Sequence, residues 1–169
     1  MKIKIDSFLI EHIGENNLLS ILKEIPDKNI TLKIGVTTSN SQLGFMRATS
    51  PSSYIIRLHY QLPTGKVITY SAFPYLYNHT SDFTLKVFIH ELAHLNIHLK
   101  SIAEKRKIKP HGVEYYNEYK KLIYNLKDLF SQDFFQKLNN CLQEKNTYTT
   151  FKKCFYKQLS QKNKLYEKQ

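Results

Sequence analysis

The chain has 169 residues, of which 41% are hydrophobic and 23% are charged, a composition that excludes a disordered segment and indicates a folded globular domain. No apolar run approaches the ~18 residues of a membrane-spanning helix, and the stretch at residues 8–10 is too short for the core of a secretion signal. These features predict one domain in the cytoplasm, without a membrane partner.

The net charge of +11 is distributed unevenly along the chain. Residues 101–169 carry 15 Lys and Arg against 7 Asp and Glu, whereas residues 1–100 carry 10 against 7. The excess in the C-terminal third is compatible with a nucleic-acid partner, although charge alone favours a solvated, lysine-rich helical surface.

The N-terminal segment, residues 1–25, is predicted to be helical because its apolar residues recur at helical spacing. Asp6 or Ser7 can cap its start, and Gly14 is expected to divide it into two short helices. Residues 30–73 then have strand character, and the expected strands are 31–36, 43–48, 54–60 and, as the weakest candidate, 66–73.

The second half of the chain is predicted to be helical. Residues 81–102 are apolar on nearly every side, as in a helix buried in a core. Further helices are expected over 111–160, followed by a frayed basic tail at 161–169. The complete pattern predicts a single α+β domain over residues 1–160, with a small antiparallel sheet packed on the buried helix and additional C-terminal helices.

Two cysteines, Cys141 and Cys154, lie within this helical region. Neither has a second Cys two residues away, so they do not form a CxxC metal motif. Since the cytosol is reducing, we expect two free thiols rather than a disulfide.

The buried helix contains the sequence HELAH at residues 90–94, an HExxH motif. His90 and His94 are four residues apart, so both imidazoles lie on one helical face and can bind one metal ion. Glu91 would then lie beside the metal, where it can take a proton from a bound water.

A catalytic zinc usually has three protein ligands, so a third ligand must come from elsewhere in the chain. His98 lies too far along the helix axis to share the ion with His90. His111, in a Lys-Pro-His-Gly turn, is the favoured third ligand, and Glu114 is the alternative. Glu118 is a weaker option that could orient a ligand.

Two neighbouring tyrosines follow the presumed third ligand. The hydroxyl of Tyr115 or Tyr116 could stabilise the oxyanion of a tetrahedral intermediate, but with twelve tyrosines in the chain, core packing is the favoured role for both.

The pairing of VFIHELAHLNIHLK with the downstream KPHGVEYYNEYKKLI resembles the SprT-like metalloprotease family, in which a His-Gly pair opens the helix after HExxH. The segment LGFMRAT and the strand YIIRLHYQL also resemble the region that precedes the catalytic helix in that family. This resemblance implies a minigluzincin-like domain and one catalytic Zn²⁺ bound by His90, His94 and His111. It also implies that Glu91 is the catalytic glutamate. The C-terminal zinc ribbon of many members is missing here, so no second metal site is expected.

The motif and the resemblance together predict a zinc-dependent metallopeptidase that acts on polypeptides, with nucleic acid as a candidate partner. One rival hypothesis is a nucleic-acid-binding module with a structural or vestigial zinc site. Another is an effector protease with a dedicated protein target. Glu91 favours an enzyme, because a purely structural zinc site needs no carboxylate beside its ligand.

Overall fold

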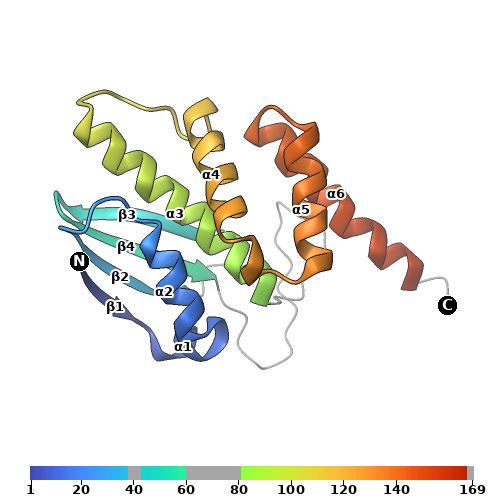
Figure 1. Ribbon diagram of the computed structural model, residues 1–169, viewed down its shortest axis with the longest axis horizontal. Coiled ribbons are helices and arrows are strands. Elements are labelled where there is room, and N and C mark those ends of the chain that lie inside the picture. The colour runs from blue at the N-terminus through green and yellow to red at the C-terminus, as the bar shows by residue number, and fades with distance from the viewer. Residues whose placement is uncertain (38–42, 60–80, 167–169) are drawn as a thin grey trace.

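A computed structural model describes residues 1–37, 43–59 and 81–166 of the chain (Figure 1). Within these residues the fold is α+β, as predicted. The elements in chain order are β1 (Lys2–Ile5), α1 (Ser7–Ile13), α2 (Glu15–Lys23), β2 (Thr31–Thr37), β3 (Gly44–Ser50), β4 (Ser53–His59), α3 (Ser81–Ala103), α4 (Val113–Asn125), the 3₁₀-helix η1 (Lys127–Leu129), α5 (Gln132–Glu144) and α6 (Tyr148–Tyr166).

The sheet has the strand order β1-β2-β4-β3 and is mixed. β1 and β4 both pair with β2 in parallel, and only β3 and β4 are antiparallel. The prediction of an antiparallel sheet was therefore wrong. The chain forms the β3–β4 hairpin locally, but β4 then inserts between β3 and β2, which makes its pairing with β2 parallel and leaves β3 at an edge.

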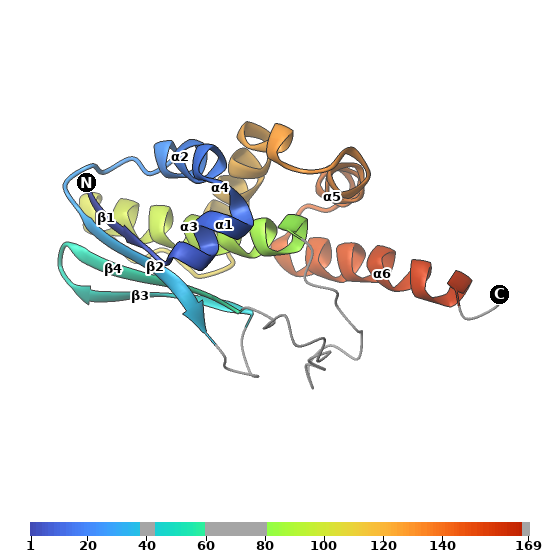
Figure 2. The same cartoon turned by 90° about the horizontal axis from the view of Figure 1, so that it is seen from below.

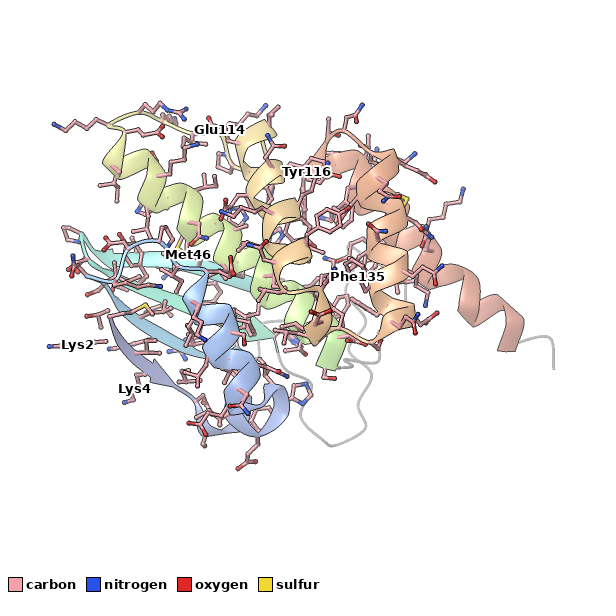
Figure 3. The ribbon with its side chains drawn as sticks, viewed as in Figure 1. Lys2, Lys4, Met46, Glu114, Tyr116 and Phe135 are labelled. Atoms are coloured by element: carbon pink, nitrogen blue, oxygen red, sulfur yellow. A yellow bond between two sulfur atoms is a disulfide. The ribbon has the colours of Figure 1, made fainter. Side chains whose placement is uncertain are left out.

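The prediction of helix throughout residues 1–25 was wrong at the beginning, where β1 forms. Lys2–Ile5 alternates lysine and isoleucine, the period-2 pattern of a strand. Lys2 and Lys4 extend outward from this edge strand (Figure 3), and such charges oppose pairing with another chain. The predicted cap is confirmed, since the Asp6 side chain accepts a hydrogen bond from the Phe8 backbone N–H. Gly14, at a φ of 92°, separates α1 from α2.

Helices α1 to α4 lie on one face of the sheet (Figure 2). The strands present alternate side chains to this layer, among them the buried Leu32 and Ile34 of β2 and Ile56 and Leu58 of β4. α3 packs between the sheet and α4 and is buried along most of its length, as its all-round apolar sequence predicted.

Helices α5 and α6 form a pair beyond the end of the sheet (Figure 1). A disulfide between Cys141 and Cys154 joins them, so the prediction of two free thiols was wrong. The pairing of the two helices brings the Cα atoms to 5.7 Å, within the range that a disulfide bridges. The assignment to the cytoplasm therefore loses the support that free thiols would have given it.

Two further expectations concern the chain's less regular parts. The strand predicted at 66–73 lies outside the described residues. The tail expected to fray from residue 161 is helical as far as Tyr166. None of the helices in the described residues combines the length and the apolar composition that crossing a membrane requires.

Candidate metal centre

Helix α3 positions two of the predicted ligands on one face. His90 and His94 follow each other by one helical turn, and their Nε2 atoms lie 3.2 Å apart. Both side chains are partly exposed, although α3 is otherwise largely buried. The two imidazoles therefore lie side by side where this buried helix is accessible to solvent.

The third histidine, His111, arrives on a tight turn. The Gly112 N–H donates to the Lys109 carbonyl, which closes a turn with Pro110 and His111 at its centre. His111 has a φ of 56°, as expected for the third residue of a type II turn, where a side chain other than that of glycine or asparagine is unfavourable. This turn places the His111 Nε2 2.9 Å from that of His94 and 3.4 Å from that of His90.

The three Nε2 atoms fit one metal ion. Zinc–nitrogen bonds of about 2.0–2.1 Å in a tetrahedral arrangement separate two ligand nitrogens by roughly 3.3–3.4 Å. The separations of 2.9, 3.2 and 3.4 Å are close to this value. His90, His94 and His111 form a group able to hold a metal ion, which agrees with the ligand set predicted from the sequence.

The protonation of the three imidazoles also suits a metal. Burial, together with the nearby His111, lowers the pKa of His94 to about 4. Burial is likewise the main cause that holds the pKa of His90 well below its ordinary value and lowers the pKa of His111. Neutral imidazoles have the free electron pair that a metal ligand needs.

Two buried tyrosines contact the second ring nitrogen of His90. The hydroxyls of Tyr115 and Tyr148 lie 2.7 Å and 2.8 Å from Nδ1 of His90. We assign the imidazole proton to Nδ1, which donates to the hydroxyl oxygens and leaves the electron pair of Nε2 directed at the cluster. The Tyr115 hydroxyl in turn donates to the His90 backbone carbonyl at 3.3 Å.

Glu91 lies directly beside the cluster. It is 5% exposed, and its Oε1 is 3.9 Å from Nε2 of His90. Burial raises the pKa of Glu91 to about 8, against the opposing effects of Lys86 and of a backbone hydrogen bond from Met46. With His90 neutral, this contact is not an ion pair. A cation bound by the histidines would favour the carboxylate form of Glu91.

Gly44 of β3 allows the sheet to approach Glu91 closely. A Cβ atom at this position would lie 3.2 Å from Cγ of Glu91 and 3.0 Å from both Cγ1 of Val87 and the carbonyl oxygen of Arg57. The glycine therefore lets β3 pass beside the histidine cluster without displacing Glu91.

A cleft of about 310 Å³ opens onto the cluster, and His90, Glu91 and His111 all line it. The sequence reasoning missed several of its other lining residues, namely Lys86, Tyr148, Lys152 and Tyr156. Lys86 could have been recognised from the sequence, because it precedes His90 by four residues and therefore lies on the same helical face as the ligands. The other three belong to α6, whose position next to α3 has no local sequence signal.

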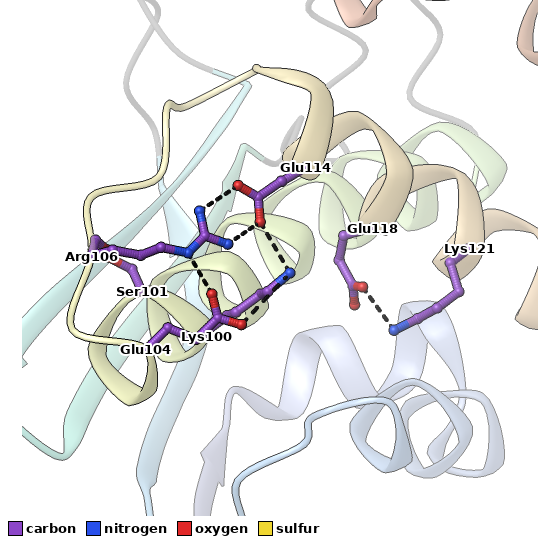
Figure 4. Close-up of polar contacts among 7 residues, drawn as sticks. All are labelled: Lys100, Ser101, Glu104, Arg106, Glu114, Glu118 and Lys121. Carbon is purple, nitrogen blue, oxygen red and sulfur yellow. Dashed lines mark hydrogen bonds and ion pairs between the residues drawn. The ribbon is translucent and has the colours of Figure 1, made fainter.

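The alternative ligand Glu114 is occupied elsewhere. Its carboxylate accepts two hydrogen bonds from Arg106 and one from Lys100 (Figure 4). These hydrogen bonds, that of Arg106 first, lower the pKa of Glu114 to about 2. Glu118 pairs with Lys121 (Figure 4) and accepts a hydrogen bond from Asn96, so it does not orient a metal ligand.

Two other candidates also lie away from the cluster. The ring of His98 packs edge-on against Tyr54, with 5.6 Å between ring centroids. The Tyr116 hydroxyl donates to the backbone carbonyl of Lys145, and its side chain lies between α4 and the α5–α6 pair (Figure 3). Tyr116 is therefore a packing residue, while Tyr115 supports His90 rather than facing the open side of the cleft.

No protein-family model matches the chain, and neither a curated protein nor a solved structure matches it. Any functional assignment must therefore be argued from the chemistry of the site.

Proposed function

We propose that the protein is a zinc-dependent metallopeptidase. The observation that carries this proposal is the convergence of three Nε2 atoms beside the buried carboxyl group of Glu91, in an open cleft. Three imidazoles are a donor set that suits zinc, and structural zinc sites usually have a fourth protein ligand. A three-ligand site with a neighbouring carboxylate is typical of hydrolytic enzymes.

In this proposal, His90, His94 and His111 hold the ion. Zinc bound there would supply Lewis-acid chemistry, which lowers the pKa of a water that it binds and polarises a carbonyl group. Glu91 accepts the proton from the attacking water and passes it to the leaving amine, as a general base and then a general acid. Tyr115 and Tyr148 keep the His90 ring in its ligand orientation.

The position of β3 supports a polypeptide substrate. Among the strands that the structure describes, β3 lies at an edge of the sheet, and its first residue, Gly44, lines the cleft. An extended peptide can pair with such an edge as an additional strand, which would carry its backbone past the metal cluster. The resemblance of HELAH and KPHG to SprT-like metalloproteases supports the same reaction, and a minigluzincin-like arrangement of the domain forms part of this proposal.

A nucleic-acid partner is the less supported part of the proposal, since only the basic charge of the C-terminal third favours it. The rival hypothesis, a binding module with a structural zinc site, does not explain why Glu91 is buried beside the ligands.

The substitution Glu91→Gln tests the proposed reaction. The amide keeps the shape of the side chain but cannot accept the proton, so we expect one zinc per chain and a loss of casein or peptide cleavage of at least ~100-fold. Glu114→Gln is the matched control, because Glu114 lies outside the cleft, and it should cleave like the wild type. Undiminished cleavage by the Glu91→Gln variant would contradict the role of Glu91.

A further inference from the structure

The cleft beside the metal cluster contains two lysines that the proposed reaction does not use. Lys86 of α3 and Lys152 of α6 both line it, together with Glu91. Lys152 follows Tyr148 by one helical turn and so lies on the same face of α6. Two lysines from helices far apart in the sequence therefore line the same cleft as the proposed active site.

Lys86 is an unusual residue to find in a core, since it is only 3% exposed. Its ammonium group lies 5.3 Å from the ring centroid of Phe155, 5.5 Å from that of Tyr156 and 6.0 Å from that of Tyr119. These rings stabilise a cation through their electron-rich faces. They also fix the side chain, so that the ammonium group is held in place rather than free to extend into solvent.

Lys86 and Lys152, which line this cleft together, repel each other. Burial, followed by the repulsion of Lys152, lowers the pKa of Lys86 to about 7, and Glu91 acts in the opposite direction. A divalent cation at the histidines would add further positive charge. A bound anion beside the two ammonium groups would reduce their mutual repulsion.

We propose that Lys86 and Lys152 form a subsite for a carboxylate group of the polypeptide substrate. This inference rests on the proposed peptidase function and specifies its substrate class: peptides that carry a carboxylate close to the scissile bond. The carboxylate comes either from an Asp or Glu side chain or from the C-terminus of the peptide. Its negative charge pairs with the Lys152 ammonium at the half-buried side of the cleft and with that of Lys86 at the buried side.

Binding can be measured without turnover in the zinc-loaded Glu91→Gln protein. Three peptides are compared by calorimetry: one with an internal Glu and an amidated C-terminus, the same peptide with Gln in place of Glu, and the Gln peptide with a free C-terminus. We expect at least one of the carboxylate peptides to bind about tenfold more tightly than the neutral one. The peptide that binds more tightly identifies the carboxylate that is recognised. If it is a side chain, only the Glu peptide gains affinity, and if it is the C-terminus, only the peptide with a free C-terminus does.

Variants assign the preference to the two lysines. Lys152→Ala, and independently Lys86→Met, should remove the advantage of the carboxylate peptide, with thermal unfolding as a check that each variant is folded. Lys153→Ala is the matched control, because Lys153 is exposed on the same helix, and it should keep the preference. Equal binding of all three peptides, or a preference that survives Lys152→Ala, overturns the subsite. Tighter binding of an oligonucleotide that Lys152→Ala abolishes, without any peptide preference, would also overturn it in favour of a phosphate site.

Cleavage by the wild-type protein separates this inference from the proposed function. If the wild type cleaves the neutral and the acidic peptides equally well, the peptidase assignment holds and the subsite is wrong. If it cleaves none of them while the zinc-loaded protein still prefers a carboxylate peptide, the subsite holds as a binding site and the peptidase assignment fails.

Discussion

The hydroxyl of Tyr115 lies 2.7 Å from Nδ1 of His90, a residue 25 positions earlier in the chain. This contact connects α4 to α3 at the histidine cluster and fixes the orientation of the His90 ring. The Tyr148 hydroxyl reaches the same nitrogen from α6. Three helices thus meet at one imidazole, which explains how a ligand on a partly exposed surface can be held rigidly.

Removing these hydroxyls should weaken metal binding without removing a ligand. Partners of this kind typically affect metal affinity by about 10–100-fold, and we expect a loss in that range for the double variant Tyr115→Phe, Tyr148→Phe. Competition with a zinc chelator measures the zinc affinity of the double variant and of the wild type. Tyr116→Phe is the control, because its hydroxyl bonds the Lys145 carbonyl instead, and it should bind zinc like the wild type. An unchanged affinity in the double variant would show that the tyrosines only pack.

His111 combines a strained backbone with its proposed role as a ligand. Its φ of 56° is more favourable for glycine, so His111→Gly should leave the metal-free protein at least as stable as the wild type in urea unfolding. The same variant should lose most of its zinc, whereas Glu114→Ala should retain it. If Glu114→Ala lost its zinc and His111→Gly retained it, the third ligand would be Glu114 and not His111.

The raised pKa of Glu91 predicts a pH dependence of stability in the metal-free protein. Because this pKa rises from an ordinary 4.5 to about 8, the folded state binds more protons than the unfolded state between these values. The wild type therefore loses stability as the pH rises through this window. As the pH rises from 4.5 to 8, the free energy of unfolding of Glu91→Gln should increase by roughly 2–5 kcal/mol relative to that of the wild type, since one pKa unit corresponds to about 1.4 kcal/mol.

Urea unfolding in the presence of a chelator, at several pH values across this window, measures that difference. Zinc should suppress it, because the cation favours the carboxylate form. A difference between the two proteins that stays constant with pH would mean that Glu91 is not held in its protonated form by burial.

The disulfide between Cys141 and Cys154 predicts a response to reducing agents. It closes a short loop between α5 and α6, and such a cross-link contributes about 3 kcal/mol. Reduction should therefore lower the melting temperature by roughly 6–12 °C. Because α6 carries Tyr148, zinc affinity should fall as well. A thiol titration that finds two free thiols before reduction would contradict the cross-link.

Most of the metal centre could be predicted from local sequence. His90 and His94 are four residues apart on one helix, so their spacing alone determines that they share a face, and Glu91 follows His90 directly in the chain. His111 lies on a separate element, but the Pro-His-Gly turn limits where the chain can go and made it the better candidate than Glu114. The structure places its Nε2 with those of the other two histidines.

The residues contributed by α6 could not be predicted in the same way. Tyr148 and Lys152 reach the cleft only because α6 packs against the end of α3, and this contact depends on the tertiary structure rather than on any local pattern. The same reason applies in part to β1, whose four residues have the period-2 alternation of a strand but become one only by pairing with β2 nearly thirty positions later. It also accounts for the disulfide, which depends on how α5 and α6 pack together.

The most direct test of the metal centre is an anomalous difference map, recorded at the zinc absorption edge from crystals grown with zinc. We predict a single strong peak about 2.0–2.1 Å from the Nε2 atoms of His90, His94 and His111, with the Glu91 carboxylate beside it but not bound to it. A peak coordinated by Glu114 instead of His111, or zinc-containing crystals with no peak at the three histidines, would contradict the account.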